Sequence, residues 1–149
     1  MIRAIVDTNV FIADQLTEYS NGSCSRVIQG IFNGDYHYLT SVETLSELQS
    51  VLSESRLLHL HGKSRIEIAE FCAGLKDLSE VVTIGEKSIE QASNMIRDVT
   101  DRKFLELALE SRSDFLVTND RRHLLPLKKI GLTKIITPHK FLMAMRNKR

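Results

Sequence analysis

The sequence predicts an α/β protein with three layers, in which helices cover both faces of a mostly parallel central sheet of about five strands. Three observations support this fold class. Short apolar segments alternate with longer segments that have helical periodicity, which is the pattern of βαβ units. The first strand is followed directly by Asp7 and the fourth ends in Thr118, Asn119 and Asp120. With 149 residues, 42% of them hydrophobic, the chain is expected to form a single domain, 1–149, with its own core.

The five predicted strands are apolar runs bounded by polar or turn residues. Their length suits strands that are buried on both faces, as in parallel sheets. They lie at Ile2–Val6, Tyr36–Thr40, Val81–Ile84, Phe115–Thr118 and Lys134–Thr137. Right-handed crossovers put the carboxyl ends of these strands at one edge of the sheet. Asp7 and Asp120 are therefore expected to come together, although they are far apart in the sequence.

The predicted helices have apolar residues three and four positions apart. Ser41 is placed to cap one of them, and Ser64-x-x-Glu67 has the spacing of a capping box for another. The helices are expected at 27–33, 42–52, 65–78, around Ala92, from about Arg102 to Ser111, at 124–127 and at 141–145.

Two connecting segments are predicted as loops. The first consists of the polar residues that follow Val10–Ala13 and continue through Ser25, and the second is His59–Gly62. Two histidines one residue apart are a weak metal signal, and we expect a surface loop there. Cys24 and Cys72 fit no Cys/His ligand pattern, so free thiols are expected.

Charge is distributed unevenly along the chain, although the formal net charge is only +1. Nine Lys or Arg and no Asp or Glu lie from Arg121 to Arg149, while all 19 acidic residues precede this segment. The asymmetry favours a polyanion or an acidic protein as partner, and solvated basic side chains on the last helices explain it equally well. The amino terminus has no signal-peptide layout and no segment is long enough to span a membrane. A cytoplasmic location without membrane association is expected.

Acidic residues are predicted near one edge of the sheet in four places. These are Asp7 after the first strand, Glu43 and Glu47 on the helix after the second, Asp98 and Asp101 before a later helix, and Asp120 after the fourth strand. Clustered carboxylates repel one another unless a cation neutralises them. Oxygen ligands without a Cys or His partner indicate Mg²⁺ or Mn²⁺, ions that activate water and hold a phosphodiester for in-line displacement.

Each acid also has a structural explanation. Asp101 could cap the helix that follows it, a role that contributes about 1 kcal/mol. Glu47 could be solvated on a polar helix face, Asp120 could be a turn residue and Asp98 a loop residue. Considered alone, only Asp7 favours function over structure. Considered together, the placement of the acids favours a site.

Five motifs follow one another along almost the whole chain. They are Val6-Asp7-Thr8-Asn9-Val10, Ser41-x5-Glu47-x3-Val51-Leu52, Asp98-x-x-Asp101-x-Lys103-Phe104-Leu105-Glu106-x-Ala108, Leu116-Val117-Thr118-Asn119-Asp120 and Thr137-Pro138-x-x-Phe141-Leu142. As an ordered set they resemble the PIN-domain family, in particular its branch of toxins of toxin–antitoxin systems, which are related to the VapC-type ribonucleases.

The resemblance implies roles for named residues. The family's four metal-binding acids match Asp7, Glu47, Asp101 and Asp120, with Asp98 as a supporting acid. By this match Glu47 is preferred to Glu43, a choice that helical geometry leaves open. Thr8, Asn9 and Thr118 would orient the carboxylates as hydrogen-bond partners.

The implied activity is that of a Mg²⁺- or Mn²⁺-dependent endoribonuclease that cleaves RNA phosphodiester bonds with metal-activated water. We expect Arg121 and Arg122, which follow the last acid directly, to help position the RNA. The resemblance further implies the toxin of a toxin–antitoxin pair, with a cognate antitoxin and a homodimeric assembly.

The sequence departs from the family pattern at three positions. Val99 stands where this branch often has Pro, Asn119 where Gly is common, and Arg122 where a further acid is frequent. Because that acid is missing, a one-metal site is expected and a second ion is left open. The alternative from another class is a noncatalytic, receiver-like module that binds phosphate or protein, but a receiver needs an Asp after its third strand, where this chain has Gly85.

Overall fold

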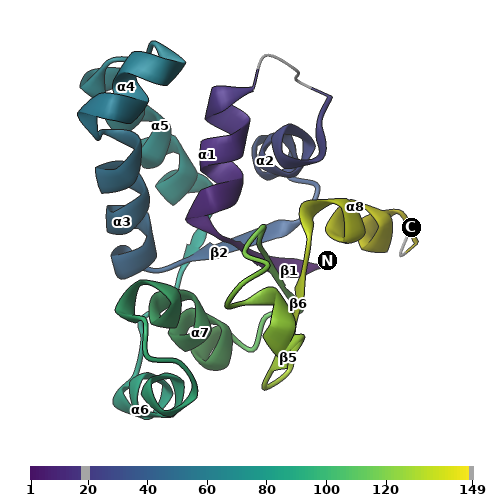
Figure 1. Cartoon of the computed structure of the whole chain (residues 1–149). Coiled ribbons are helices and arrows are strands. Elements are labelled where there is room, and N and C mark those ends of the chain that lie inside the picture. The colour runs from purple at the N-terminus through teal and green to yellow at the C-terminus, as the bar shows by residue number, and fades with distance from the viewer. Residues whose placement is uncertain (18–20, 148–149) are drawn as a thin grey trace.

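A mixed six-stranded sheet with the order β3-β2-β1-β4-β6-β5 forms the centre of the molecule (Figure 1). The computed structural model describes residues 1–17 and 21–147, with the backbone alone for 99 and 100. The elements in chain order are β1 Arg3–Val6, α1 Thr8–Leu16, α2 Ser23–Asn33, β2 His37–Thr40, α3 Val42–Leu52, α4 Ser55–His61, α5 Arg65–Leu78, β3 Glu80–Val81, α6 Glu86–Met95, α7 Val99–Ser111, β4 Phe115–Val117, the 3₁₀ helix η1 Leu125–Leu127, β5 Lys129–Ile130, β6 Thr133–Ile136 and α8 Pro138–Asn147.

The sheet is mostly parallel, as predicted. β1 pairs in parallel with β2 on one side and with β4 on the other, and β4 pairs in parallel with β6. The added strand is β5, which lies at the edge and runs antiparallel to β6. It was not predicted from the sequence, because two residues are too short to show a strand pattern.

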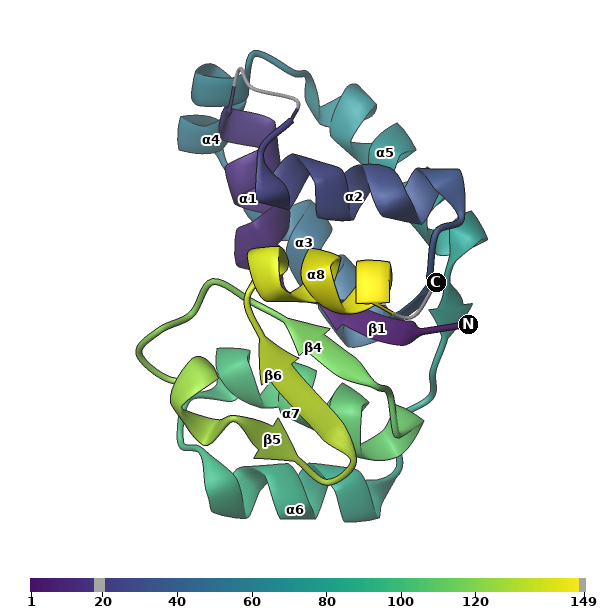
Figure 2. The same ribbon diagram turned by 90° about the vertical axis from the view of Figure 1, so that its right-hand side faces the viewer.

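Helices cover both faces of the sheet, which confirms the predicted three-layer arrangement (Figures 1 and 2). Successive strand residues point to opposite faces. Ala4 and Val6 pack into a cluster with residues of α1, α2, α3, α5 and α8, whereas Ile5 packs with residues of α6 and α7. The central strand is thus buried on both sides, up to the residue that precedes Asp7.

Both predicted caps are present and fix the starts of α3 and α5. The hydroxyl of Ser41 accepts a hydrogen bond from the backbone N–H of Thr44 at 3.1 Å. The hydroxyl of Ser64 accepts from the N–H of Glu67 at 3.1 Å, and the Glu67 carboxylate accepts from the N–H of Ser64 at 3.2 Å. None of the described helices is long and apolar enough to cross a membrane.

Both loop predictions were partly wrong. Thr8–Leu16 forms the helix α1, whose apolar residues Val10–Ala13 are consecutive and therefore showed no helical spacing. The histidine pair lies in α4, which ends at Gly62 in a left-handed conformation with φ of 70°. His61 Nδ1 accepts from the N–H of Lys63 at 3.1 Å, so its Nε2 carries the proton and donates to the Leu52 carbonyl at 3.1 Å. His61 thus has both ring nitrogens engaged in local structure, which is no arrangement for metal binding.

Several element boundaries also differ from the prediction, and α2 begins at Ser23, four residues before the expected start at 27 and inside the segment predicted as a loop. The third strand, β3, is Glu80–Val81 in place of Val81–Ile84. The helix α7 begins at Val99, three residues earlier than expected, and α8 extends over Pro138–Asn147. The earlier start of α7 matters because Asp101 then lies inside the first turn of the helix and is not its cap.

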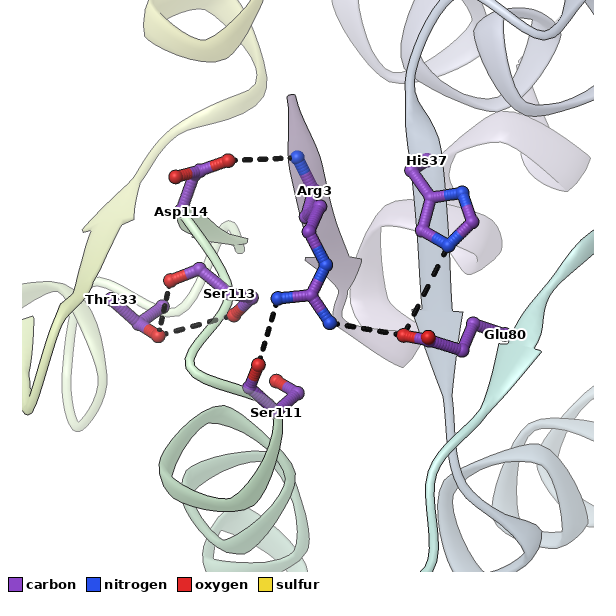
Figure 3. A network of polar contacts seen from close by, with 7 residues as sticks. All are labelled: Arg3, His37, Glu80, Ser111, Ser113, Asp114 and Thr133. Carbon is purple, nitrogen blue, oxygen red and sulfur yellow. Dashed lines mark hydrogen bonds and ion pairs between the residues drawn. The ribbon is translucent and has the colours of Figure 1, made fainter. Parts of the chain in front are cut away.

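The opposite edge of the sheet, at the amino ends of the strands, is held together by Arg3 (Figure 3). Its guanidinium donates to Glu80 Oε2 at 3.0 Å and to the Ser111 carbonyl at 2.8 Å. Its backbone N–H donates to Asp114 Oδ2 at 2.9 Å, and His37 Nε2 lies 4.0 Å from Glu80 Oε2. These contacts join β1 to β3, to the end of α7 and to the start of β4, so they stabilise the fold far from the acidic edge.

We expect Arg3→Met to lower the free energy of unfolding by roughly 1–2 kcal/mol, because it removes a charged hydrogen bond to a carbonyl together with a partly exposed ion pair. Glu80→Gln removes only the charge of the pair and should cost less than about 1 kcal/mol. Urea unfolding of both variants measures the difference. Equal losses of stability would show that the Ser111 contact contributes nothing.

Candidate metal centre

Asp7 lies at the junction of β1 and α1 and is only 7% exposed. It occupies the N-cap position of α1, yet its side chain makes no capping hydrogen bond. An Asp at this position usually accepts from the first backbone N–H groups of the helix. Here Oδ2 accepts instead from the Thr118 hydroxyl at 2.7 Å. The carboxylate is therefore directed across the sheet edge toward the end of β4.

The hydroxyl of Thr118 connects the ends of the two central strands. It accepts hydrogen bonds from the backbone N–H of Asp120 at 2.9 Å and from Asn9 Nδ2 at 3.3 Å. A hydroxyl has one hydrogen and two lone pairs, so with two donors bound its hydrogen is committed to Asp7. Asn9 contacts Thr118 and, through Oδ1, the N–H of Asn119 at 3.1 Å, and it orients the carboxylates only indirectly.

Glu47 of α3 reaches the same edge. It is half-buried, and its Oε2 accepts from the hydroxyl of Thr8 at 3.2 Å. Glu43, one turn earlier on the same helix, is exposed and acts electrostatically on Glu106. Of these two acids on α3, Glu47 is thus the one whose charge affects the pKa of Asp7, and its role as a metal ligand stays a prediction.

The remaining acids come from α7 and from the loop after β4. Asp101 is half-buried in the first turn of α7, and Asp98 is exposed immediately before this helix. Asp120 Oδ1 accepts from the backbone N–H groups of Arg122 at 3.0 Å and His123 at 2.9 Å. This is a turn of the kind that Asp favours. The turn uses one oxygen only, and Oδ2 has no hydrogen-bond partner among the described residues.

The carboxylates influence one another's protonation. Burial raises the pKa of Asp7 to about 7 despite the hydrogen bond from Thr118, and the nearby charges of Glu47 and Asp101 raise it further. Burial also raises the pKa of Glu47, and the charges of Asp101 and Asp98 add to this. The pKa of Asp101 is raised by burial and then by Asp120 and Asp98. The mutual repulsion expected from the sequence is present, but burial is the larger cause in each case.

Two basic residues near this edge were given no role in the sequence-based prediction. The ammonium of Lys103, on α7, lowers the pKa of Glu47, and His123 lowers that of Asp101. Lys103 lies two positions after Asp101, within one of the family motifs. This position in the motif was the sequence signal that could have placed Lys103 near the acids. Both residues moderate the negative charge of the acidic edge.

The donor set fits a hard divalent cation by its chemistry, because it consists of carboxylate oxygens. In the described part of the chain Asp7 has no Lys or Arg partner, so a buried carboxylate is left without a counter-charge. Among the described residues, no three Asp, Glu, His or Cys side chains lie close enough together to bind one metal ion in their present conformations. The acids thus form one electrostatic cluster whose members stand apart.

The positions that depart from the family pattern have individual explanations. Asn119 does not have a positive φ, so this loop does not require Gly, and its Nδ2 contacts Cys24 Sγ at 3.3 Å. Arg121 and Arg122 are exposed beside Asp120. The side chain of Val99 lies outside the described residues. Cys24 and Cys72 are free, as expected.

Three solved structures share this fold. A chain of VapBC2 from Rickettsia felis, bound to a DNA fragment from its promoter, is 15% identical with a TM-score of 0.62, and the match covers 91% of this chain and 98% of that one. A chain of DNA-bound VapBC from Salmonella typhimurium is 18% identical with a TM-score of 0.61, covering 93% and 99%. PAE2754 from Pyrobaculum aerophilum is 18% identical with a TM-score of 0.61, covering 98% and 90%.

No match was found among curated proteins. The family model of the PIN domain matches residues 3–122, a range that contains all the acids described above and most of the chain. The protein therefore belongs to the PIN-domain family.

Proposed function

We propose that this protein is a Mg²⁺- or Mn²⁺-dependent endoribonuclease. The observation that carries the proposal is the buried carboxylate of Asp7, which has no Lys or Arg partner among the described residues and is affected electrostatically by Glu47 and Asp101 at the carboxyl edge of the sheet. Such an arrangement disfavours the ionised protein unless a cation binds. Membership of the PIN-domain family adds support, since divalent metals are general among PIN nucleases.

The proposed ligands are Asp7, Glu47, Asp101 and Asp120, with Asp98 in a supporting role. A divalent ion held by them would activate water and neutralise the charge that develops on the phosphodiester. Thr118 directs the Asp7 carboxylate, and Thr8 directs that of Glu47. The backbone N–H groups of Arg122 and His123 hold one oxygen of Asp120, which leaves the other for the site.

The proposed biological role is that of a toxin restrained by a cognate antitoxin. Two of the similar structures are VapBC assemblies bound to DNA, which supports a protein partner for this chain. We further propose a homodimer, a cytoplasmic location, a single domain over residues 1–149 and RNA as the substrate, with Arg121 and Arg122 contacting its phosphates.

The first test is cleavage of single-stranded RNA, structured RNA and single-stranded DNA in Mg²⁺, in Mn²⁺ or in EDTA. We expect RNA cleavage only with metal, and a loss of at least about 100-fold for Asp7→Asn or Asp101→Asn, because each removes a charged ligand. Glu43→Gln, on the same helix as Glu47 but exposed, is the matched control and should retain activity. If no nucleic acid were cleaved, a noncatalytic regulator would be the better conclusion, and if Asp101→Asn cleaved normally the ligand assignment would be wrong.

The second test concerns the stability of the metal-free protein. A carboxyl group with a pKa of about 7 when folded and an ordinary value near 3.8 when unfolded binds more protons in the folded state between these values. Stability is therefore lost as pH rises from about 4 to about 7. In EDTA at about pH 8 we expect Asp7→Asn to be more stable than the wild type by roughly 1–3 kcal/mol, and this gain should disappear near pH 4.

Added Mg²⁺ should stabilise the wild type more than Asp7→Asn, because a ligand stabilises only through its affinity for the folded state. Thermal melts of both proteins at one ionic strength measure both effects. An Asp7→Asn variant that is less stable in EDTA and responds normally to Mg²⁺ would instead make Asp7 a structural hydrogen-bond acceptor.

The third test addresses the arginines beside Asp120. Replacing Arg121 and Arg122 by Gln should weaken RNA binding and reduce the slope of log K against log salt by about 0.7 for each RNA phosphate that is no longer neutralised. Fluorescence anisotropy in EDTA at several salt concentrations measures this. An unchanged slope would assign these charges to solubility or to a protein partner.

A further inference from the structure

Three lysines gather on the β5–β6 hairpin at the edge of the sheet. Lys128 directly precedes β5, Lys129 lies in β5 and Lys134 lies in β6, and all three are exposed. Lys129 and Lys134 are direct partners across the antiparallel pair, so their side chains project from the same face. Among the described residues, none of the three forms an ion pair with a carboxylate.

This placement is unfavourable for the isolated hairpin, because like charges directly opposite each other destabilise a strand pair. A lysine on an edge strand often prevents pairing with other sheets, which accounts for Lys129. It does not account for Lys134, since β6 lies between β5 and β4. In β3, the strand at the other edge of the sheet, the charge of Glu80 is neutralised by Arg3, whose Nη2 lies 3.0 Å from Glu80 Oε2 (Figure 3). The positive charge of the lysine pair is therefore left accessible to a ligand from outside the chain.

The face from which the lysine pair projects is open. Thr133 and Ile135 are buried, and Ile135 packs on the α6 and α7 side of the sheet. Since strand residues alternate between faces, Lys134 lies on the other side, which it shares with Ile136 and α8. Figure 2 shows the β5–β6 hairpin below α8, with no helix drawn across it.

A short hydrogen-bonded path connects this hairpin to the acidic edge. The N–H of Leu125 donates to the Asp120 carbonyl at 2.9 Å, and the N–H of Lys128 donates to the Leu125 carbonyl at 3.1 Å. The Lys128 carbonyl accepts in turn from the N–H of Ile135 at 2.9 Å. The backbone thus connects Asp120 to the start of the hairpin, and no acidic residue intervenes in the sequence between Arg121 and Lys134.

We propose that Lys128, Lys129 and Lys134 form a phosphate-binding surface that holds the backbone of single-stranded RNA beyond the cleavage site. This inference rests on the proposed nuclease function and extends it to the binding of longer substrates. Lys134 lies opposite Phe115, at the start of β4, so an RNA strand that is cleaved beside Asp120 reaches the lysine pair when it runs along the open face of the hairpin toward the amino ends of β4 and β6. An acidic protein would match the charge too, but continuity with Asp120 favours the substrate.

The experiment uses the whole chain and fluorescent RNAs of about 4 and about 16 nucleotides, lengths that bracket usual single-strand site sizes. Binding is measured in EDTA, between about 50 and about 200 mM salt, for Lys129→Gln/Lys134→Gln. The control is Lys76→Gln/Lys87→Gln, which removes two exposed lysines from α5 and α6. Circular dichroism melts establish that both variants are folded.

We expect the hairpin variant to bind the longer RNA about 10-fold more weakly than the wild type at low salt, with the slope of log K against log salt reduced by about 1.4. The reduction should be smaller for the short RNA, and the control should bind both like the wild type. Equal effects of the two variants would overturn the proposal. So would unchanged RNA binding together with weakened binding of polyglutamate, since this would assign the surface to an acidic protein.

Cleavage with Mg²⁺ separates this inference from the function on which it rests. A wild-type protein that cleaves no RNA, but whose hairpin variant loses binding to the long RNA, would reject the nuclease and support the surface. If the wild type cleaves RNA but binds the long RNA no better than the hairpin variant does, the phosphate-binding surface is rejected and the nuclease function is kept.

Discussion

One hydrogen bond, from the hydroxyl of Thr118 to the buried carboxylate of Asp7, joins the two strand ends on which the acidic edge is built. It is possible because β1 and β4 are parallel neighbours in register, with Val6 opposite Val117, so the residues that follow them meet at the same level. The Asn9 amide and the Asp120 N–H donate to the two lone pairs of the Thr118 oxygen, so the hydroxyl hydrogen is the part of this group that bonds to Asp7. The orientation of Asp7 is therefore set by backbone pairing deep in the sheet and does not depend on a surface loop.

This constraint has an electrostatic consequence. A carboxylate placed at the end of a strand that is buried on both faces loses its hydration, and the hydroxyl of Thr118 and the backbone of Thr8 compensate for that loss only in part. The positive end of α1 also lies at Asp7, where a helix favours an anion, yet the pKa still rises. The fold thus holds an acid in a position that is unfavourable by itself, and the neighbouring acids add to the cost. By contrast, Glu80 at the opposite edge is partly exposed and paired with Arg3, as a purely structural charge would be.

The sequence predicted those features that depend on burial and on strand ends. Buried apolar runs gave four of the strands closely, and their parallel order followed from the helices between them. The strand β5 and the helix α1 were missed for physical reasons, since two residues carry no period and Val10–Ala13 form a continuous apolar run. At the site, spacing alone could not choose between Glu43 and Glu47, because both lie on the same side of α3. The hydroxyl of Thr8 distinguishes them, and this contact between α1 and α3 exists only in the folded chain.

Asp120 shows why structural and functional explanations of an acid need not exclude each other. Its Oδ1 is engaged by two backbone N–H groups of the turn that follows, so the turn explanation is correct for that atom. The same two bonds fix the side chain and leave Oδ2 at the edge where Asp101 lies, whose pKa rises through this neighbour. A substitution of Asp120 would therefore disturb the turn and the charge of the acidic edge together. At Asp7 the structural contact is the hydrogen bond from Thr118, which an amide oxygen can accept as well as a carboxylate can, so Asp7→Asn removes the charge and keeps an acceptor for that bond.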